Sequence, residues 1–135
     1  MFGMMRNPAA SYATVSVDVA IETANPHRLV LMLFDGAIAA IVVSKSQMAA
    51  GDIALKGSNI SRAIDIVANG LKASLDMASG GELAERLAAL YDYITQRLLW
   101  ANLKNEPAAL DEAMNLLKEL REAWEQITPG QQEAA

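Results

Sequence analysis

Three breaks divide most of the chain into four long segments, and this division constrains the fold more than any other feature. The breaks are Gly51-Asp52, Ser79-Gly80-Gly81 and Asn105-Glu106-Pro107. Gly commonly follows the last turn of a helix, Asp and Asn cap the first turn, and Pro is tolerated at the first helical position. Segments of about 20 to 26 residues with short connections place neighbouring helices antiparallel, so the breaks predict an up-down bundle.

The signals at both ends complete this division. Asn25-Pro26 predicts the start of the first helix, and Thr128-Pro129-Gly130 predicts the end of the last. We therefore expect an all-α fold, an antiparallel up-down four-helix bundle in residues 21–128. The predicted helices are 26–50, 52–78, 82–104 and 107–127. Residues 1–20 are predicted to form a flexible N-terminal arm or an extra short helix, and residues 129–135 a disordered tail.

The composition excludes several functions. The 135 residues include no cysteine, so neither a disulfide framework nor a thiolate metal site can form. The net charge is −5, and the 11 Lys and Arg residues are scattered, which argues against nucleic acid as a partner. The longest apolar stretch, residues 29–43, contains Asp35 and is shorter than the ~20 residues of a membrane span. The N-terminus also lacks the apolar core of a secretory signal.

Helical periodicity predicts one core stripe on each of the last three helices. The expected core residues of the second helix are Ile53, Ile60, Ile64, Val67, Leu71 and Leu75. Those of the third are Leu83, Leu87, Leu90, Ile94, Leu98 and Ala101. Those of the fourth are Leu110, Ala113, Leu117, Leu120, Trp124 and Ile127. The first helix is apolar almost all round from Leu29 to Val43, which is typical of a helix covered on several sides.

The second and third helices carry apolar residues outside these stripes. Leu55, Ile66 and Met77 lie away from the core stripe of the second helix, and Tyr93, Leu99 and Trp100 lie away from that of the third. One four-helix core cannot use all of this apolar surface. Three explanations stay open: the chain dimerises, its own arm covers the surplus, or a partner does.

A catalytic centre is not expected. Di-iron sites in helical bundles need Glu-x-x-His pairs, and the only histidine, His27, lies in a predicted first turn. Ser44, Ser46, Ser58 and Ser61 have no neighbouring base and are predicted to lie on helix surfaces. Gly80-Gly81 predicts a helix end and a turn, and the acidic run at Glu119, Glu122 and Glu125 predicts a solvated face. We therefore expect no cofactor and no metal.

Four blocks of sequence resemble the flagellin-specific export chaperones of the FliS family, in the same order and spacing. The blocks are residues 23–37 (TANPHRLVLMLFDGA), 75–82 (LDMASGGE), 90–102 (LYDYITQRLLWAN) and 120–124 (LREAW). The resemblance extends over residues 12–127. It implies a helical bundle of the bacterial cytoplasm that binds the disordered C-terminal segment of flagellin and prevents premature polymerisation before export.

The resemblance also implies where a partner would bind. An extended client needs grooves outside the core, and the surplus apolar residues would supply them. The expected partner-binding residues are Tyr12 in the arm and Leu55, Ile66, Met77, Tyr93, Leu99 and Trp100 in the bundle. The flagellar export apparatus and a weak homodimer are further partners in this hypothesis. The alternative function is a helical dimerisation or adapter module without a flagellin client.

Overall fold

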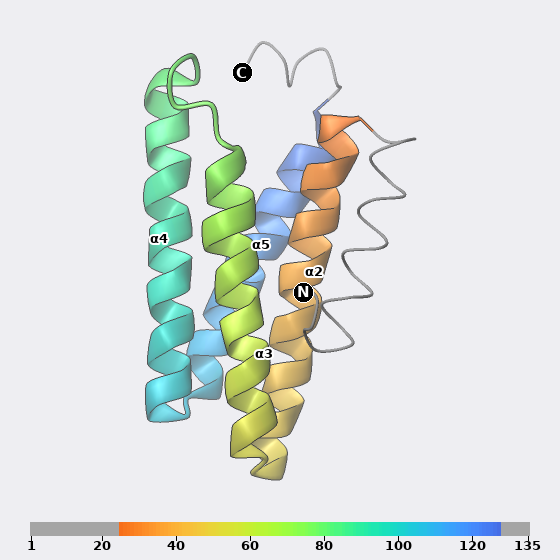
Figure 1. Cartoon of the computed structure of the whole chain (residues 1–135), viewed down its shortest axis with the longest axis vertical. Coiled ribbons are helices and arrows are strands. Elements are labelled where there is room, and N and C mark those ends of the chain that lie inside the picture. The colour runs from red at the N-terminus through yellow and green to blue at the C-terminus, as the bar shows by residue number, and fades with distance from the viewer. Residues whose placement is uncertain (1–24, 128–135) are drawn as a thin grey trace.

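The computed structural model describes residues 25–127 and shows four antiparallel helices side by side (Figure 1). The helices are α2 (Pro26–Ala50), α3 (Ile53–Asp65), α4 (Gly81–Lys104) and α5 (Pro107–Gln126). A π-helical segment, η1 (Ile66–Leu71), and a 3-10 turn, η2 (Lys72–Ser74), extend α3. Helix α2 packs against α3 and α5, and α4 packs against the same two helices, so α2 and α4 are diagonal neighbours. The predicted all-α bundle is confirmed.

The helix ends follow the residues that predicted them. The Asn25 side chain accepts a hydrogen bond from the Arg28 backbone N–H (3.0 Å), and Pro26 begins α2. Gly51 ends α2 in the left-handed conformation, with φ 78°, and the Asp52 side chain then caps α3. The Asn25 and Asp52 side chains and the Gly51 N–H satisfy backbone groups that a helix end leaves free, and Pro26 has no N–H to satisfy.

The second helix ends earlier than predicted. Helical structure stops at Ser74, and Leu75 is extended, so the predicted end at residue 78 is wrong. The following turn is stabilised by Asp76, whose carboxylate accepts hydrogen bonds from the backbone N–H groups of Ala78 and Ser79. Gly80 is required here, because a Cβ at this position would lie 2.5 Å from the carbonyl oxygen of Asp76. Gly80 therefore belongs to the turn before α4 and Gly81 to the first turn of α4, so neither glycine ends α3.

The buried residues correct two of the predicted core stripes. Ile53 is 60% exposed and Leu83 is 55% exposed, so neither belongs to the core. On α4 the buried residues are Ala84, Tyr91, Ile94, Leu98 and Ala101. Periodicity did not place Tyr91 in the core, because the stripe through Leu87, Leu90 and Ile94 is as apolar as the one that includes Tyr91. Only the packing of α4 against α3 and α5 decides which edge of this apolar face is buried. The stripe of α5 is confirmed at Leu110, Ala113 and Leu117, with Leu120 and Trp124 partly buried against the core.

Two polar residues are buried in the core, Ser44 and Lys56. Ser44 is buried, contrary to its predicted surface position, and its hydroxyl donates to the carbonyl of Ile41 (2.9 Å). Lys56 is buried too, and its Nζ donates to the Asn102 carbonyl (3.1 Å) and to the Asn105 side chain (3.0 Å). These acceptors lie at the end of α4, where carbonyls have no partner within the helix. Lys56 thereby ties the start of α3 to the end of α4.

Helix α2 is the one described helix that is long and apolar enough to cross a membrane by length and composition. Within the bundle it packs along α3 and α5. Its buried residues are Phe34, Ala37, Ala40, Ile41, Ser44 and Met48. Its opposite side carries the charge of Asp35, which pairs with Arg121 of α5 (2.5 Å).

The hydroxyl of Tyr91 makes the core sensitive to alkaline pH. Burial raises the pKa of Tyr91 to about 12 from an ordinary value of 10.0. The folded state disfavours tyrosinate, so its full stability is present below pH ~10 and is lost as the pH rises toward ~12. We expect a loss of up to roughly 2 kcal/mol across this window, measured by urea unfolding at a series of pH values. Tyr91→Phe should flatten this part of the profile, and an unchanged profile would contradict the assignment.

Candidate partner-binding surface

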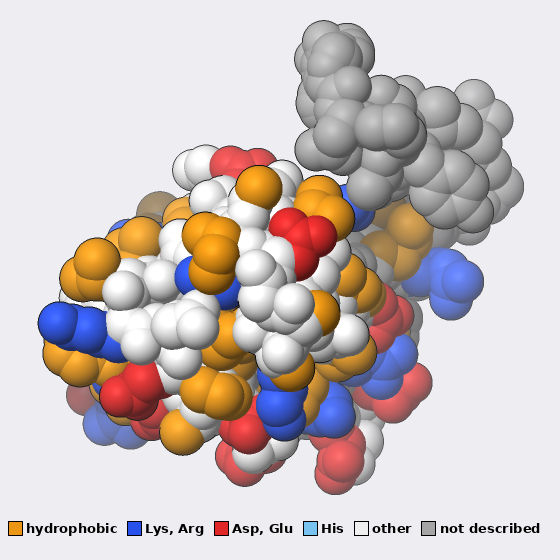
Figure 2. Space-filling view, turned by 90° about the horizontal axis from the view of Figure 1, so that it is seen from below, with side chains coloured by type: hydrophobic (Ala, Val, Ile, Leu, Met, Phe, Trp, Pro, Cys, Tyr) orange, Lys and Arg blue, Asp and Glu red, His pale blue; other side chains and the backbone are white. Residues whose placement is uncertain are grey.

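Ten large hydrophobic side chains are exposed among the described residues. They are Val42 and Val43 of α2, Ile53 and Leu55 of α3, Met77 of the turn, and Leu83, Tyr93, Leu99, Trp100 and Leu103 of α4. Seen from the end of the bundle where α3 begins and α4 ends, hydrophobic side chains are spread over the surface among charged and other groups (Figure 2). Contiguous exposed apolar patches are typical of interaction surfaces, whereas single exposed apolar residues are common on any protein.

Leu55 and Ile66 lie along the boundary between α2 and α3. Leu55 is exposed, and Asn59, one turn further on, donates to Gln47 of α2 (2.9 Å). Ile66 faces α2 more directly. Gly36 of α2 has no side chain, and a Cβ added there would lie 3.4 Å from the Ile66 Cδ1 atom. Ile66 lies outside the cluster of buried core residues, but it is partly buried and packs against that cluster.

Tyr93 lies on the α5 side of α4. Its hydroxyl donates to the Glu112 carboxylate of α5, and Arg97 Nε donates to the same carboxylate (2.7 Å). The hydrogen bond to Glu112 raises the pKa of Tyr93, and the hydrogen bonds from Tyr93 and then Arg97 lower the pKa of Glu112. These hydrogen bonds hold the exposed tyrosine ring in a fixed direction. Less side-chain conformational entropy would therefore be lost when a partner binds to it.

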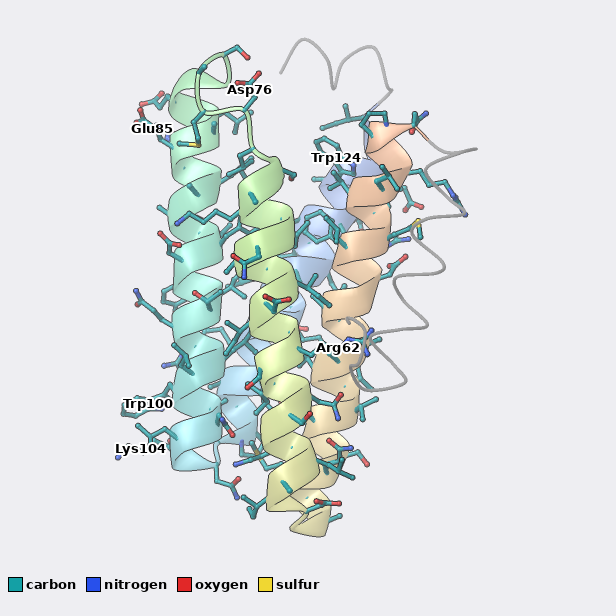
Figure 3. The ribbon with its side chains drawn as sticks, viewed as in Figure 1. Arg62, Asp76, Glu85, Trp100, Lys104 and Trp124 are labelled. Carbon is teal, nitrogen blue, oxygen red and sulfur yellow. The ribbon has the colours of Figure 1, made fainter. Side chains whose placement is uncertain are left out.

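Trp100 and Leu99 extend the apolar surface toward the end of α4. Trp100 projects away from the other helices beside Lys104, whose Nζ lies 5.4 Å from the centre of a Trp100 ring (Figure 3). Leu99 lies seven residues after Asp92, which pairs with Lys72 (2.8 Å), so Leu99 is on the α3 side of α4. Met77 is exposed in the turn at the opposite end of the bundle.

The predicted site residues therefore do not form one patch. They lie on the α2–α3 boundary, on the two sides of α4 and in the α3–α4 turn, while Tyr12 lies outside the described residues. Sequence reasoning missed Leu103, which at 77% has the greatest exposure among these large hydrophobics. Its spacing of three from Trp100 and ten from Tyr93 is a helical signal that could have found it.

His27 has a structural environment. Its ring stacks on Trp124 with centroids 5.3 Å apart, and the Trp124 indole N–H donates to the His27 carbonyl (2.9 Å). These contacts join the first turn of α2 to the last turns of α5. No group of three or more metal-ligating side chains occurs within residues 25–127.

The fold and its surface thus define a class of protein: an up-down helical bundle that exposes apolar side chains on several sides. The family model described as "Flagellar protein FliS" matches residues 8–131. The flagellar secretion chaperone FliS of Salmonella typhimurium is 50% identical over 119 residues, which cover 88% of each chain. The chaperone of the same name from Vibrio cholerae is 38% identical over 125 residues, covering 93% of this chain and 91% of the relative.

A third relative, the flagellar secretion chaperone FliS of Escherichia coli, is 40% identical over 116 residues, covering 86% of this chain and 85% of the relative. The chain belongs to the FliS family of flagellar secretion chaperones. The resemblance noted in the four sequence blocks is confirmed.

Proposed function

We propose that this protein is a cytoplasmic, non-enzymatic chaperone that binds the C-terminal segment of flagellin and prevents its polymerisation before export. The observation that carries the proposal is the spread of exposed apolar side chains over several sides of one bundle. A single rigid partner could cover one side. A segment that is disordered when free can follow the surface and contact all of them.

The proposed contact residues of the bundle are Leu55, Ile66, Met77, Tyr93, Leu99 and Trp100, with Tyr12 preceding the described part of the chain. Apolar and aromatic side chains suit this role, because Met adapts to irregular surfaces and aromatic rings supply large contact areas. The exposed fraction of Ile66 is smaller than that of the others, so we expect it to form the floor of a groove and Leu55 its edge. Contacts with the flagellar export apparatus would come in addition.

Titration calorimetry with a synthetic flagellin C-terminal segment tests the proposal. We expect binding with a favourable enthalpy, an opposing entropy and a negative heat-capacity change on the order of several tenths of a kcal/mol/K, because a disordered segment becomes ordered and buries apolar surface. A peptide of the same composition in scrambled order is the control. Absence of binding, or a heat-capacity change near zero, would count against a wrapped client.

A further inference from the structure

Asn69 is the only asparagine of the 135 residues that is followed by glycine. The backbone nitrogen of the residue after an asparagine can attack the side-chain amide, and glycine shields this nitrogen least because it has no Cβ. The Asn69 side chain is exposed, so water reaches it. Asn69 and Gly70 lie in η1, where the helix that begins as α3 departs from α-helical geometry. The sequence most prone to this reaction therefore occurs in an irregular helical segment.

In the folded chain two features keep the Gly70 nitrogen away from the Asn69 side chain. Backbone N–H groups of a π-helix bond to carbonyls five residues earlier, as the N–H of Lys72 does with the carbonyl of Val67. Gly70 lies inside this ladder, so its N–H is directed along the helix axis. The amide of Asn69 is held as well, because its Nδ2 donates to Asp65 Oδ1 (2.7 Å), one turn earlier. The amide thus points back along the helix, and the attack requires η1 to open.

The structure around η1 indicates that this opening is local. Val67 and Leu71 are 0% exposed and anchor the segment in the core. Against this, a glycine inside a helix is unfavourable, and π-helical geometry is rare. The segment is followed by only three residues of 3-10 helix and then by the extended Leu75, so no further α-helical turn holds it on that side. Segments with these properties open without unfolding of the whole domain.

We propose that Asn69 is a site of spontaneous modification whose rate is set by local opening of η1. In the open segment the Gly70 nitrogen gives its proton to water and forms a bond to Cγ of Asn69. The Cγ–Nδ2 bond then breaks, and Nδ2 takes up a proton and leaves as ammonia. Water hydrolyses the resulting succinimide ring at either of its carbonyls, which gives aspartate or isoaspartate at this position. One water is consumed for each ammonia released, and no atom is oxidised or reduced.

Either product would weaken the folded segment. An aspartate would place a second carboxylate one turn after Asp65, in place of the amide that now donates to it, and like charges at this spacing repel. An isoaspartate would route the backbone through the side-chain carbon and add a methylene between Val67 and Leu71, which are both buried. It would also displace Gly70, which is so close to α2 that a Cβ would lie 3.1 Å from the Leu33 side chain. The modification would therefore loosen the contact of η1 with α2 permanently.

Mass spectrometry of tryptic peptides from the full chain tests the proposal. Cleavage after Arg62 and Lys72 releases residues 63–72, in which Asn69 is the only side-chain amide. At mildly alkaline pH we expect deamidation of this peptide to be about tenfold or more slower in the native chain than in the chain unfolded by guanidinium chloride. Asn69→Gln is the control, because glutamine closes a larger ring much more slowly. Equal rates in the native and unfolded chains, or no reaction at Asn69 in the unfolded chain, would overturn the proposal.

Two variants separate local opening from global unfolding. Leu33→Ala removes the contact of α2 with Gly70 and should raise the native rate of deamidation several-fold. Leu117→Ala leaves a cavity in the core on α5 and lowers the stability of the whole bundle, but it should leave the native rate almost unchanged. Circular dichroism establishes that both variants are folded. Equal acceleration by the two changes would mean that the reaction needs global unfolding, and the role of η1 would be refuted.

The modified chain itself tests the consequence. It carries an additional negative charge, so ion-exchange chromatography separates it from the unmodified chain. We expect the modified chain to unfold at a lower urea concentration and to exchange the amide hydrogens of η1 faster. Identical unfolding midpoints and exchange rates would contradict the expected loosening of η1. These measurements need no partner, so their outcome does not depend on the proposed function.

Discussion

Leu98→Ala is expected to lower the free energy of unfolding by about 2 to 5 kcal/mol, because it leaves a cavity in the core of the bundle. The side chain of Leu98 is 0% exposed and belongs to the buried stripe of α4. The neighbouring Leu99 is 56% exposed. Leu99→Ala removes the same atoms from the same helix, so it is a matched control with an expected cost below about 1 kcal/mol. Urea unfolding followed by circular dichroism measures both values.

The opposite result would be informative about the fold. Equal losses for Leu98→Ala and Leu99→Ala would mean that α4 is rotated relative to its neighbours, or that a second copy covers Leu99 in solution. Repeating the unfolding at several protein concentrations distinguishes these cases, because the stability of a dimer depends on concentration.

Trp100→Asp is expected to weaken binding of the flagellin C-terminal segment by about 2 to 4 kcal/mol while the fold is retained. The indole is exposed at the end of α4, so the aspartate is solvated in the free protein. In the complex the new charge would be desolvated against an apolar partner, which is costly. Calorimetry measures the loss of affinity, and circular dichroism tests the fold. Unaltered affinity would remove Trp100 from the proposed surface.

Ile66→Asp provides a contrast with Trp100→Asp. The sequence pattern predicts that both changes spare the fold, but the structure places Ile66 partly buried against α2 and the core. A charge at Ile66 would therefore lower stability as well as affinity. Only the Trp100 variant separates binding from folding, and Ile66 should be tested with Ile66→Ala in parallel unfolding and binding measurements.

Capping chemistry explains why the helix ends were largely predictable. Asn25, Gly51, Asp52 and Pro107 act through hydrogen bonds or backbone conformations that involve only nearby residues. The end of α3 was mispredicted because apolar periodicity continues through Leu75 and Met77. The π-helical segment at Ile66–Leu71 changes the helical register there. Gly70 in this segment lies close to α2, because a Cβ at Gly70 would be 3.1 Å from the Leu33 side chain.

Sequence periodicity identified the candidate surface in part. Leu55, Tyr93, Leu99 and Trp100 were expected outside the core, and all four are exposed. Leu103 was missed because it lies close to the end of α4, where few residues remain to show a helical period. Ile53 and Leu83 were assigned to the core because the sequence of one helix does not show how far the neighbouring helices extend along it. Tyr12 stays a prediction.

The sequence by itself determined the four long helical segments of residues 25–127, most of their ends and the family, because these depend on local capping signals and on motifs that are contiguous in the chain. Only the tertiary structure decided which edge of each apolar stripe is covered. Tyr91 and Lys56 are buried and Ile53 and Leu83 exposed because of how α2, α3, α4 and α5 are placed against one another. Burial depends on atoms supplied by other helices, and the periodicity of one helix contains no information about them.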